Sequence, residues 1–307
     1  MSQADRQPTY IENAFDLADE RAYVAWREQK IANYPAESGE ITVEIANPHR
    51  LTQEEILAIG KACSCANMAI YSIKGSDNPL VKASEDKSIV ADLGRHFGLE
   101  HLDTNLYADD ESISSIEVSG ERRQFEYIPY SNKAISWHTD GYYNPPERKI
   151  RAMVLHCVRP AARGGENALM DHEMLYLLMR DENPLYIEAL MRPDVMTIPA
   201  NVENGVEIRP AQTGPVFSLD PESGCLHLRY TARTRSIEWK QDKTTKSAVR
   251  CLEEILASDS PYIFHNRLSA GQGIICNNVL HTRSAFEDDE DCEGRLVYRA
   301  RYYDRVK

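Results

Sequence analysis

The segment KAISWHTD at residues 133–140 carries the residue types and the spacing that best fit metal chemistry. His138 and Asp140 are two positions apart, so on a strand they project from the same face. An imidazole and a carboxylate placed in this way can occupy adjacent positions on one metal ion, and His281, at the end of a later predicted strand, can supply a third ligand. Two histidines and one carboxylate form the facial triad of non-heme Fe(II) oxygenases. His-x-Asp alone is a weak signal, because an ordinary hydrogen-bonded pair has the same pattern.

Two arginines close to the end of the chain add a second chemical feature. Arg295 and Arg299 lie in a segment that reads as a strand, and their spacing places both on one face. Arginine binds carboxylates through two parallel hydrogen bonds and stays charged when it is buried. A dicarboxylate that chelates a metal through one end needs an anchor of this kind at its other end.

Together these motifs resemble the taurine/2-oxoglutarate dioxygenase (TauD/TfdA) family of Fe(II)-dependent oxygenases. The resemblance rests on the His-Thr-Asp motif, the late histidine, the Arg-x-x-x-Arg tail and the segment Gly-Gly-Glu-Asn at 164–167, and it covers about residues 105–305. It implies that Fe(II) is bound by His138, Asp140 and His281. It also implies that O2 and 2-oxoglutarate are co-substrates, and that succinate and CO2 are released when an unactivated C–H bond is hydroxylated.

The resemblance implies residues for the co-substrate as well. Arg295 would hold the distal carboxylate of 2-oxoglutarate, and Asn167 stands where taurine dioxygenase has a threonine that assists this arginine. An amide can also hydrogen-bond a carboxylate, so Asn167 keeps this predicted role. Arg299 matches an arginine that contacts the anionic group of the substrate in the taurine enzyme, and it can equally reinforce the co-substrate site. An acidic insert at 286–294 makes the spacing from His281 to Arg295 longer than in the taurine enzyme.

The residues directly after the metal motif are candidates for contact with the substrate. Tyr142, Tyr143 and Asn144 follow the His-Thr-Asp motif and are expected to overhang the metal. Binding and catalytic residues are concentrated on loops of this kind. A plain packing loop explains the same three residues equally well, so both interpretations stay open.

A basic cluster in the segment LRYTARTRSIEW is unusual in so acidic a chain. It consists of Arg229, Arg233 and Arg235. One interpretation is a solvated strand edge, because charged clusters usually lie on the surface. The other is a wall that recognises an anion and steers a carboxylate, sulfonate, phosphate or acidic sugar toward the iron.

The elements that must position these residues are mostly short strands bounded by turns. The predicted strands are 41–48, 114–119, 133–140, 151–158, 214–220, 225–232, 261–267, 272–280 and 294–303. The predicted helices are 13–33, one that begins at a capping box formed by Thr52 and Glu55, 85–97, 172–181, 185–191 and 246–258. Many short strands without a β-α-β rhythm favour a mainly β fold with flanking helices, a double-stranded β-helix or jelly roll of the cupin type.

Length and composition favour one large globular domain. No linker or repeat divides the 307 residues, so we expect a single domain over 1–307, with an N-terminal helical segment at 1–40 and a jelly-roll core at about 105–305. The net charge of −13 disfavours binding to nucleic acid. No apolar run suggests a transmembrane segment, and seven cysteines without a signal pattern favour reduced thiols and a cytoplasmic location.

The sequence therefore predicts an Fe(II)/2-oxoglutarate-dependent dioxygenase, an oxidoreductase that hydroxylates a small anionic molecule. One alternative is a facial-triad iron oxygenase that does not use 2-oxoglutarate, although Arg295 and Arg299 argue against it. A second alternative is a jelly roll that binds a metal or ligand without turnover, although the intact ligand set argues against it. Relatives in the resembling family often form homo-oligomers such as dimers or tetramers, but this is an association, and the oligomeric state of this chain stays open.

Overall fold

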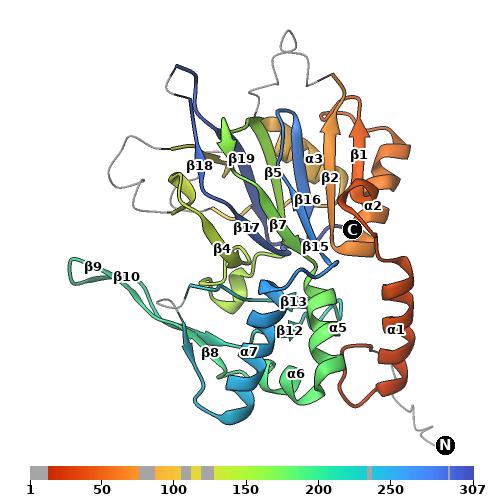
Figure 1. Ribbon diagram of the computed structural model, residues 1–307, viewed down its shortest axis with the longest axis vertical. Helices are drawn as coiled ribbons and strands as arrows, with labels where there is room; N and C mark the ends of the chain where they lie inside the picture. Colours follow the sequence, from red (N-terminus) through yellow and green to blue (C-terminus); the bar gives the residue numbers. More distant parts are fainter. Residues whose placement is uncertain (1–12, 76–86, 105–111, 119–127, 234–236, 290) are drawn as a thin grey trace, which may run out of the picture.

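The computed structural model describes residues 13–75, 87–104, 112–118, 128–233, 237–289 and 291–307 (Figure 1). Within these ranges the protein is mainly β, with two larger sheets and flanking helices. None of the helices in these ranges is long and apolar enough to cross a membrane. The prediction of a mainly β protein with flanking helices is confirmed for the described residues.

A six-stranded sheet forms one side of the core, and its strand order is β1-β2-β16-β5-β19-β3. Its members are β1 (Thr42–Ile45), β2 (Met68–Ile73), β16 (Gln272–Cys276), β5 (Ala152–Arg159), β19 (Leu296–Tyr302) and β3 (Ser114–Ile116). All neighbours are antiparallel except β1 and β2, which run parallel. Because β1 and β2 belong to this sheet, the β core begins well before the expected start at about residue 105.

A four-stranded antiparallel sheet carries the metal motif, and its strand order is β15-β7-β17-β4. Its members are β15 (Ile263–Asn266), β7 (Asn167–Met170), β17 (Leu280–Arg283) and β4 (Ile135–His138). Leu169 and Phe264 of this sheet belong to the same buried cluster as Val154 and Ile274 of the six-stranded sheet. The apolar faces of the two sheets therefore share one core, which fixes the strands that hold the polar site residues.

Shorter pairs of strands complete the β structure. They are β6 (Arg163–Gly164) with β18 (Phe286–Glu287), β9 (Asn201–Glu203) with β10 (Val206–Arg209), and β12 (Phe217–Leu219) with β13 (Leu226–Leu228). A three-stranded sheet joins β8 (Met196–Ile198) to β11 (Gln212–Gly214) and β14 (Glu238–Trp239). The β9–β10 hairpin projects away from the rest of the protein at the left of Figure 1.

Helices cover both sheets. The helices are α1 (Glu20–Asn33), α2 (Gln53–Ala66), α3 (Ser88–His96), α5 (His172–Glu182), α6 (Pro184–Leu190) and α7 (Lys243–Ala257). Three short 3-10 turns are η1 (Ser38–Ile41), η2 (Ile128–Tyr130) and η3 (Pro146–Arg148). Helices α2 and α3 pack on the six-stranded sheet, whereas α5, α6 and α7 gather at the lower end of the view in Figure 1.

The start of α2 confirms the predicted capping box. The Thr52 hydroxyl accepts a hydrogen bond from the Glu55 backbone N–H at 3.2 Å, and the Glu55 carboxylate accepts one from the Thr52 N–H at 2.7 Å. This reciprocal pair satisfies two backbone donors that a helix leaves without partners at its start. The predicted N-terminal helix, in contrast, begins at Glu20 and not at residue 13.

Candidate metal centre

His138, Asp140 and His281 come together at one end of the four-stranded sheet. Strand β4 pairs with β17, and His138 is the direct register partner of His281. One ligand atom from each of the three residues lies within 4.8 Å of the other two. The Nε2 atoms of His138 and His281 lie 3.7 Å and 3.9 Å from Asp140 Oδ1. Residues from two distant parts of the chain thus present two imidazoles and a carboxylate to one point in space.

Backbone hydrogen bonds leave the Nε2 atoms of both histidines available. The Nδ1 atom of His138 lies 2.9 Å from the carbonyl oxygen of Ser136, and the Nδ1 atom of His281 lies 2.9 Å from that of Val279. A carbonyl oxygen only accepts, so Nδ1 carries the proton and Nε2 carries the free lone pair. The hydrogen bond at Nδ1 also orients each imidazole ring, as is usual for histidines that bind metals.

The charge states of the three side chains suit a cation. Burial lowers the pKa of His138 to about 3, and the nearby imidazole of His281 lowers it further by charge repulsion. Burial also lowers the pKa of His281. Burial alone would raise the pKa of Asp140, but the guanidinium groups of Arg299 and Arg301 overcome this effect and hold the pKa below its ordinary value. Two neutral imidazoles and an ionised carboxylate are the protonation states that a divalent metal requires.

The turn after Asp140 depends on a glycine. Gly141 has φ of +67°, and a Cβ atom at this position would lie 2.4 Å from Cγ1 of Ile150. Any larger residue would be strained and would clash, so glycine lets the chain reverse immediately after the carboxylate. The Asn144 N–H then donates to the Gly141 carbonyl oxygen at 2.8 Å, which closes a turn directly after the carboxylate.

Arg295 lies beside the metal-ligand strands and has an unused donor. Its side chain is buried, and Nη1 has no hydrogen-bond partner in the part of the chain that the structure describes. Its guanidinium lies 5.2 Å from the ring centroid of Phe286, and the guanidinium of Arg283 lies 4.8 Å from the same centroid. Nη1 and Nη2 of Arg283 already donate to the carbonyl oxygens of Pro129, Ser131 and Lys133, whereas its buried Nε has no partner among the described residues. Within the described residues, Arg295 thus keeps a terminal guanidinium nitrogen, Nη1, for an anionic ligand, whereas both terminal nitrogens of Arg283 are used.

Arg295 directly precedes strand β19. Strand β19 begins at Leu296, one residue after Arg295, and its register with β5 shifts between Leu296 and Val297. The extra residue of this irregularity lies in β5, because Leu296 pairs with Arg159 and Val297 with Cys157. The shared strand face of Arg295 and Arg299 stays a prediction, because Arg295 itself lies outside β19.

Arg299 and Asn167 both have partners within the protein. Arg299 Nη1 lies 3.2 Å from Oδ2 and 3.4 Å from Oδ1 of Asp140, so the two side chains form a buried ion pair. The Asn167 amide donates to the carbonyl oxygen of Thr282 at 2.9 Å, which joins β7 to the strand that carries His281. Arg299 is thus next to the carboxylate ligand, a contact that the sequence did not indicate.

The loop after the metal motif is held by an arginine. Arg301 Nη1 donates to the hydroxyl oxygen of Tyr143 at 3.1 Å, and Arg301 is also ion-paired to buried Asp103. The ring of Tyr142 meets the ring of Tyr143 edge-on, with centroids 5.1 Å apart. The Asn144 amide donates to the carbonyl oxygen of Arg148, within its own loop.

Arg209 is a residue near this loop that the sequence analysis missed. It ends strand β10, and its guanidinium lies 5.6 Å from the ring centroid of Tyr143. It donates to the carbonyl oxygens of Pro199 and Pro210. The sequence offered no signal for this proximity, because the β9–β10 hairpin was not predicted.

The basic cluster is described only in part, and its first arginine is held by backbone carbonyl oxygens. Arg229 donates to the carbonyl oxygens of Met196, Gln212, Gly214 and Pro215, and burial lowers its pKa to about 10. Its donors therefore hold β8 and β11 in place and do not face a ligand. Arg233 is exposed, and Arg235 lies outside the described residues.

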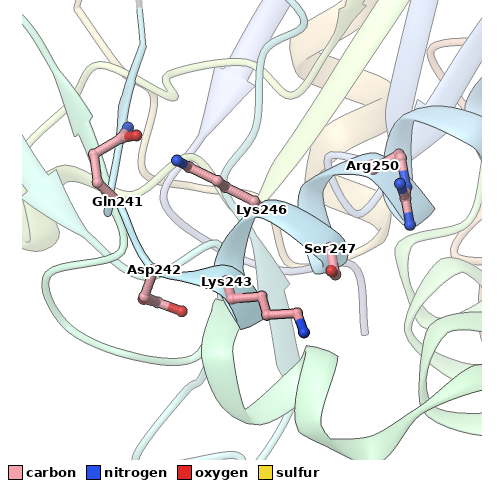
Figure 2. Close-up of a pocket in the computed structure, with 6 residues that line it drawn as sticks. All are labelled: Gln241, Asp242, Lys243, Lys246, Ser247 and Arg250. Carbon is pink, nitrogen blue, oxygen red and sulfur yellow. The ribbon is translucent and has the colours of Figure 1, made fainter.

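A separate surface hollow of about 310 Å³ lies at the start of α7 (Figure 2). Its lining residues are Gln241, Asp242, Lys243, Lys246, Ser247 and Arg250. The Asp242 carboxylate already caps the helix through the Thr245 N–H and is ion-paired to Arg192. Its lining includes no histidine or cysteine, and the only carboxylate is committed, so this hollow offers no counterpart to the metal centre.

Comparison with known sequences supports the same chemistry. A family model described as "Taurine catabolism dioxygenase TauD, TfdA family" matches residues 79–301. A uridine-5'-phosphate dioxygenase from Amycolatopsis sp is 32% identical over 171 residues, which cover 54% of this chain and 60% of that protein. A uridine-5'-phosphate dioxygenase from Streptomyces sp is 28% identical over 221 residues, which cover 69% of this chain and 77% of that protein. The match with the Amycolatopsis protein thus spans less than two thirds of that relative's length.

Comparison with solved structures shows the same fold at low sequence identity. An asparagine oxygenase in complex with Fe(II), 2S,3S-3-hydroxyasparagine and succinate has a TM-score of 0.55 at 16% identity, covering 83% of this chain and 85% of that one. The non-heme iron oxygenase OrfP in complex with Fe and alpha-ketoglutaric acid has a TM-score of 0.59 at 14% identity, covering 83% of this chain and 81% of that one. At these identities the likeness concerns the fold.

Proposed function

The chain belongs to the TauD, TfdA family of iron- and 2-oxoglutarate-dependent dioxygenases, and we propose that it oxidises an unactivated C–H bond in a small anionic substrate. The observation that carries the proposal is the meeting of His138, Asp140 and His281, with ligand atoms within 4.8 Å of one another. The buried Nη1 atom of Arg295, which has no hydrogen-bond partner among the described residues, adds the cationic donor that a dicarboxylate co-substrate needs.

The roles of these residues follow from their contacts. The Nε2 atoms of His138 and His281 and one oxygen of Asp140 would hold Fe(II), and Arg295 would bind the distal carboxylate of 2-oxoglutarate. Asn167 would support that carboxylate from β7. When bound, the iron with 2-oxoglutarate and O2 supplies the oxidant, and succinate and CO2 are released. The chain itself fixes the ligands, holds both imidazoles neutral and excludes water by burial.

Arg299 takes a positioning role in this proposal. Arg299 Nη1 lies 3.2 Å from Oδ2 and donates to Oδ1 at 3.4 Å, so the guanidinium contacts both oxygens and would fix the orientation of the carboxylate beside the two histidine Nε2 atoms. The pair also keeps the carboxylate ionised at low pH, because the positive charge favours the anion. This contact favours support of the metal ligand over direct contact with substrate.

The substrate is proposed to be an anion that is bound above the metal by the loop after Asp140. Arg301 donates to the Tyr143 oxygen, so the Tyr143 O–H is directed away from that arginine and can donate to an anionic oxygen. Tyr142 and Asn144 flank it in the same loop, and Arg209 supplies positive charge at the ring of Tyr143. Because both curated relatives are uridine-5'-phosphate dioxygenases, a nucleoside 5'-monophosphate is the first substrate class to examine.

The fold proposed for this function is a double-stranded β-helix in one catalytic domain over residues 1–307. The shared core between the four-stranded and six-stranded sheets supports it, as does the placement of all three ligands on one end of the smaller sheet.

The experiment is a substrate screen that monitors O2 uptake and succinate. The Fe(II) protein is incubated with 2-oxoglutarate and a panel of nucleoside 5'-monophosphates, sugar phosphates, sulfonates and amino acids. We expect one class of anionic compound to stimulate O2 uptake and succinate formation, with one succinate formed for each O2 consumed. O2 uptake that is independent of 2-oxoglutarate would instead favour a facial-triad oxygenase of another kind, and metal binding without any turnover would favour a binding protein.

A further inference from the structure

Asn278 has a buried amide whose three hydrogen bonds all go to the backbone beside the carboxylate ligand. Its Oδ1 atom accepts from the Asp140 N–H at 2.8 Å. Its Nδ2 atom donates to the Asp140 carbonyl oxygen at 2.9 Å and to the Ile150 carbonyl oxygen at 2.7 Å. Both polar groups of the amide are therefore used, and both backbone polar groups of Asp140 are bound by one side chain.

Asn278 also lies on the segment that carries a second ligand. It precedes His281 by three residues, in the short connection between β16 and β17. His281 is in turn the register partner of His138. The amide is therefore a direct link between the chain segment that presents Asp140 and the segment that presents His281, in addition to the strand pairing that joins the two histidines.

The backbone of Asn278 is shaped for this contact. Its φ is +50°, in the left-handed region that asparagine tolerates better than most residues other than glycine. The residue is only 3% exposed. If the amide moved away, several buried polar groups would lose their hydrogen-bond partners, which would cost free energy. The amide is therefore held closely in this position.

We propose that Asn278 is a positioning residue for the metal centre: its amide sets the separation between Asp140 and the two histidine ligands and thereby sets metal affinity. This inference rests on the metal site proposed above. Contacts one step removed from a metal typically change its affinity by about 10–100-fold when they are lost. Asn278 differs from such contacts in acting on the backbone of the ligand residue and not on its side chain.

Asn277 provides a matched control. It is the neighbouring residue, it is also buried, and its amide also makes two hydrogen bonds, to Asn67 Oδ1 and from the Val306 N–H. Neither partner belongs to the metal site. Asn277→Ala should therefore weaken the fold without altering the metal, whereas Asn278→Gly removes the amide and keeps a residue that accepts positive φ.

The test is a Co(II) titration of the wild-type, N277A and N278G proteins, monitored by the visible ligand-field bands and by thermal unfolding of the metal-free proteins. We expect N278G to bind Co(II) about 10–100-fold more weakly and to show shifted bands at saturation, while N277A keeps the wild-type affinity and spectrum. The inference is overturned if N278G loses thermal stability but retains the wild-type affinity and spectrum.

A second variant keeps the test decisive if N278G fails to fold. Asn278→Asp retains the acceptor for the Asp140 N–H and loses both donors, so we expect a weakened affinity and altered bands. Wild-type behaviour of N278D would contradict the inference. Failure of the wild-type protein to bind Co(II) is a different outcome, because it would overturn the proposed metal site itself.

Discussion

His138 and His281 face each other as register partners on adjacent antiparallel strands, with their ring centroids 4.1 Å apart. Side chains that are directly opposite on two paired strands project from the same face. The relative position of the two imidazoles is therefore determined by backbone hydrogen bonds of the sheet. Asp140, just beyond the end of β4, then completes the set from the turn that Gly141 permits.

Removal of one imidazole should remove metal binding while leaving the fold. His281→Ala should weaken Fe(II) binding by at least a hundredfold, because only one imidazole and one carboxylate would remain. Equilibrium dialysis under anaerobic conditions measures the affinity, and circular dichroism checks the fold. His265→Ala, at an exposed histidine on β15, is the control and should bind normally. Normal affinity of the His281 variant would eliminate this residue as a ligand.

Loss of the Arg295 guanidinium should weaken the co-substrate and spare the metal. A hydrogen bond to a charged group contributes about 1.5–3 kcal/mol, so Arg295→Ala should raise the concentration of 2-oxoglutarate for half-maximal O2 uptake at least tenfold. Arg163→Ala removes an exposed arginine that is paired with Glu287, and it should have no such effect. If the Arg295 variant requires no more 2-oxoglutarate than wild type, another residue binds the distal carboxylate.

The hydroxyl group of Tyr143 should contribute to substrate binding. Tyr143→Phe removes a donor that Arg301 orients, so we expect the KM for an active anionic substrate to rise about tenfold. The apparent affinity for 2-oxoglutarate should stay unchanged, which separates this effect from damage to the metal centre. Tyr186→Phe on α6 is a control for the loss of a phenol elsewhere. An unchanged KM would place the substrate anion against a different part of the site.

Acid should destabilise the metal-free protein through buried histidines outside the metal centre. Burial lowers the pKa of His156 and of His172 to about 4. As the pH falls below about 6.5 the unfolded chain takes up protons at these positions and the folded chain does not, so the free energy of unfolding decreases. Each group contributes a loss of about 1.4 kcal/mol per pH unit inside this window, which ends near pH 4.

Urea unfolding between pH 7.5 and pH 5 measures this dependence. His156→Gln should make the pH dependence shallower, because one group no longer titrates differently in the two states. Stability that stays constant or increases on acidification would show that these histidines are protonated in the folded protein.

The sequence predicted the parts of the site that depend on short-range periodicity. His138 and Asp140 were found because a period of two places them on one face, and Arg295 was found because an arginine close to the end of the chain matched the need of a dicarboxylate. Strand β2 was missed, because its first four residues are all buried and lack the alternation that marks a half-exposed strand.

The contacts that were missed or misread all join distant segments. The sequence left Arg229 either on a solvated strand edge or in an anion-binding wall, whereas in the structure it donates to backbone carbonyl oxygens of the 196–215 region. The ion pair of Arg299 with Asp140 and the amide contacts of Asn278 depend on how strands are arranged. Residue types indicate that such side chains need partners, and only the assembled fold shows which partners they have.

Anaerobic titration of the Fe(II) protein with 2-oxoglutarate tests the central claim most directly. Chelation of the iron by 2-oxoglutarate gives a weak charge-transfer band in the visible spectrum. We predict that this band appears in the wild-type protein and is absent from the His281→Ala variant. Fe(II) binding to the wild-type protein without any such band would contradict the proposed use of 2-oxoglutarate.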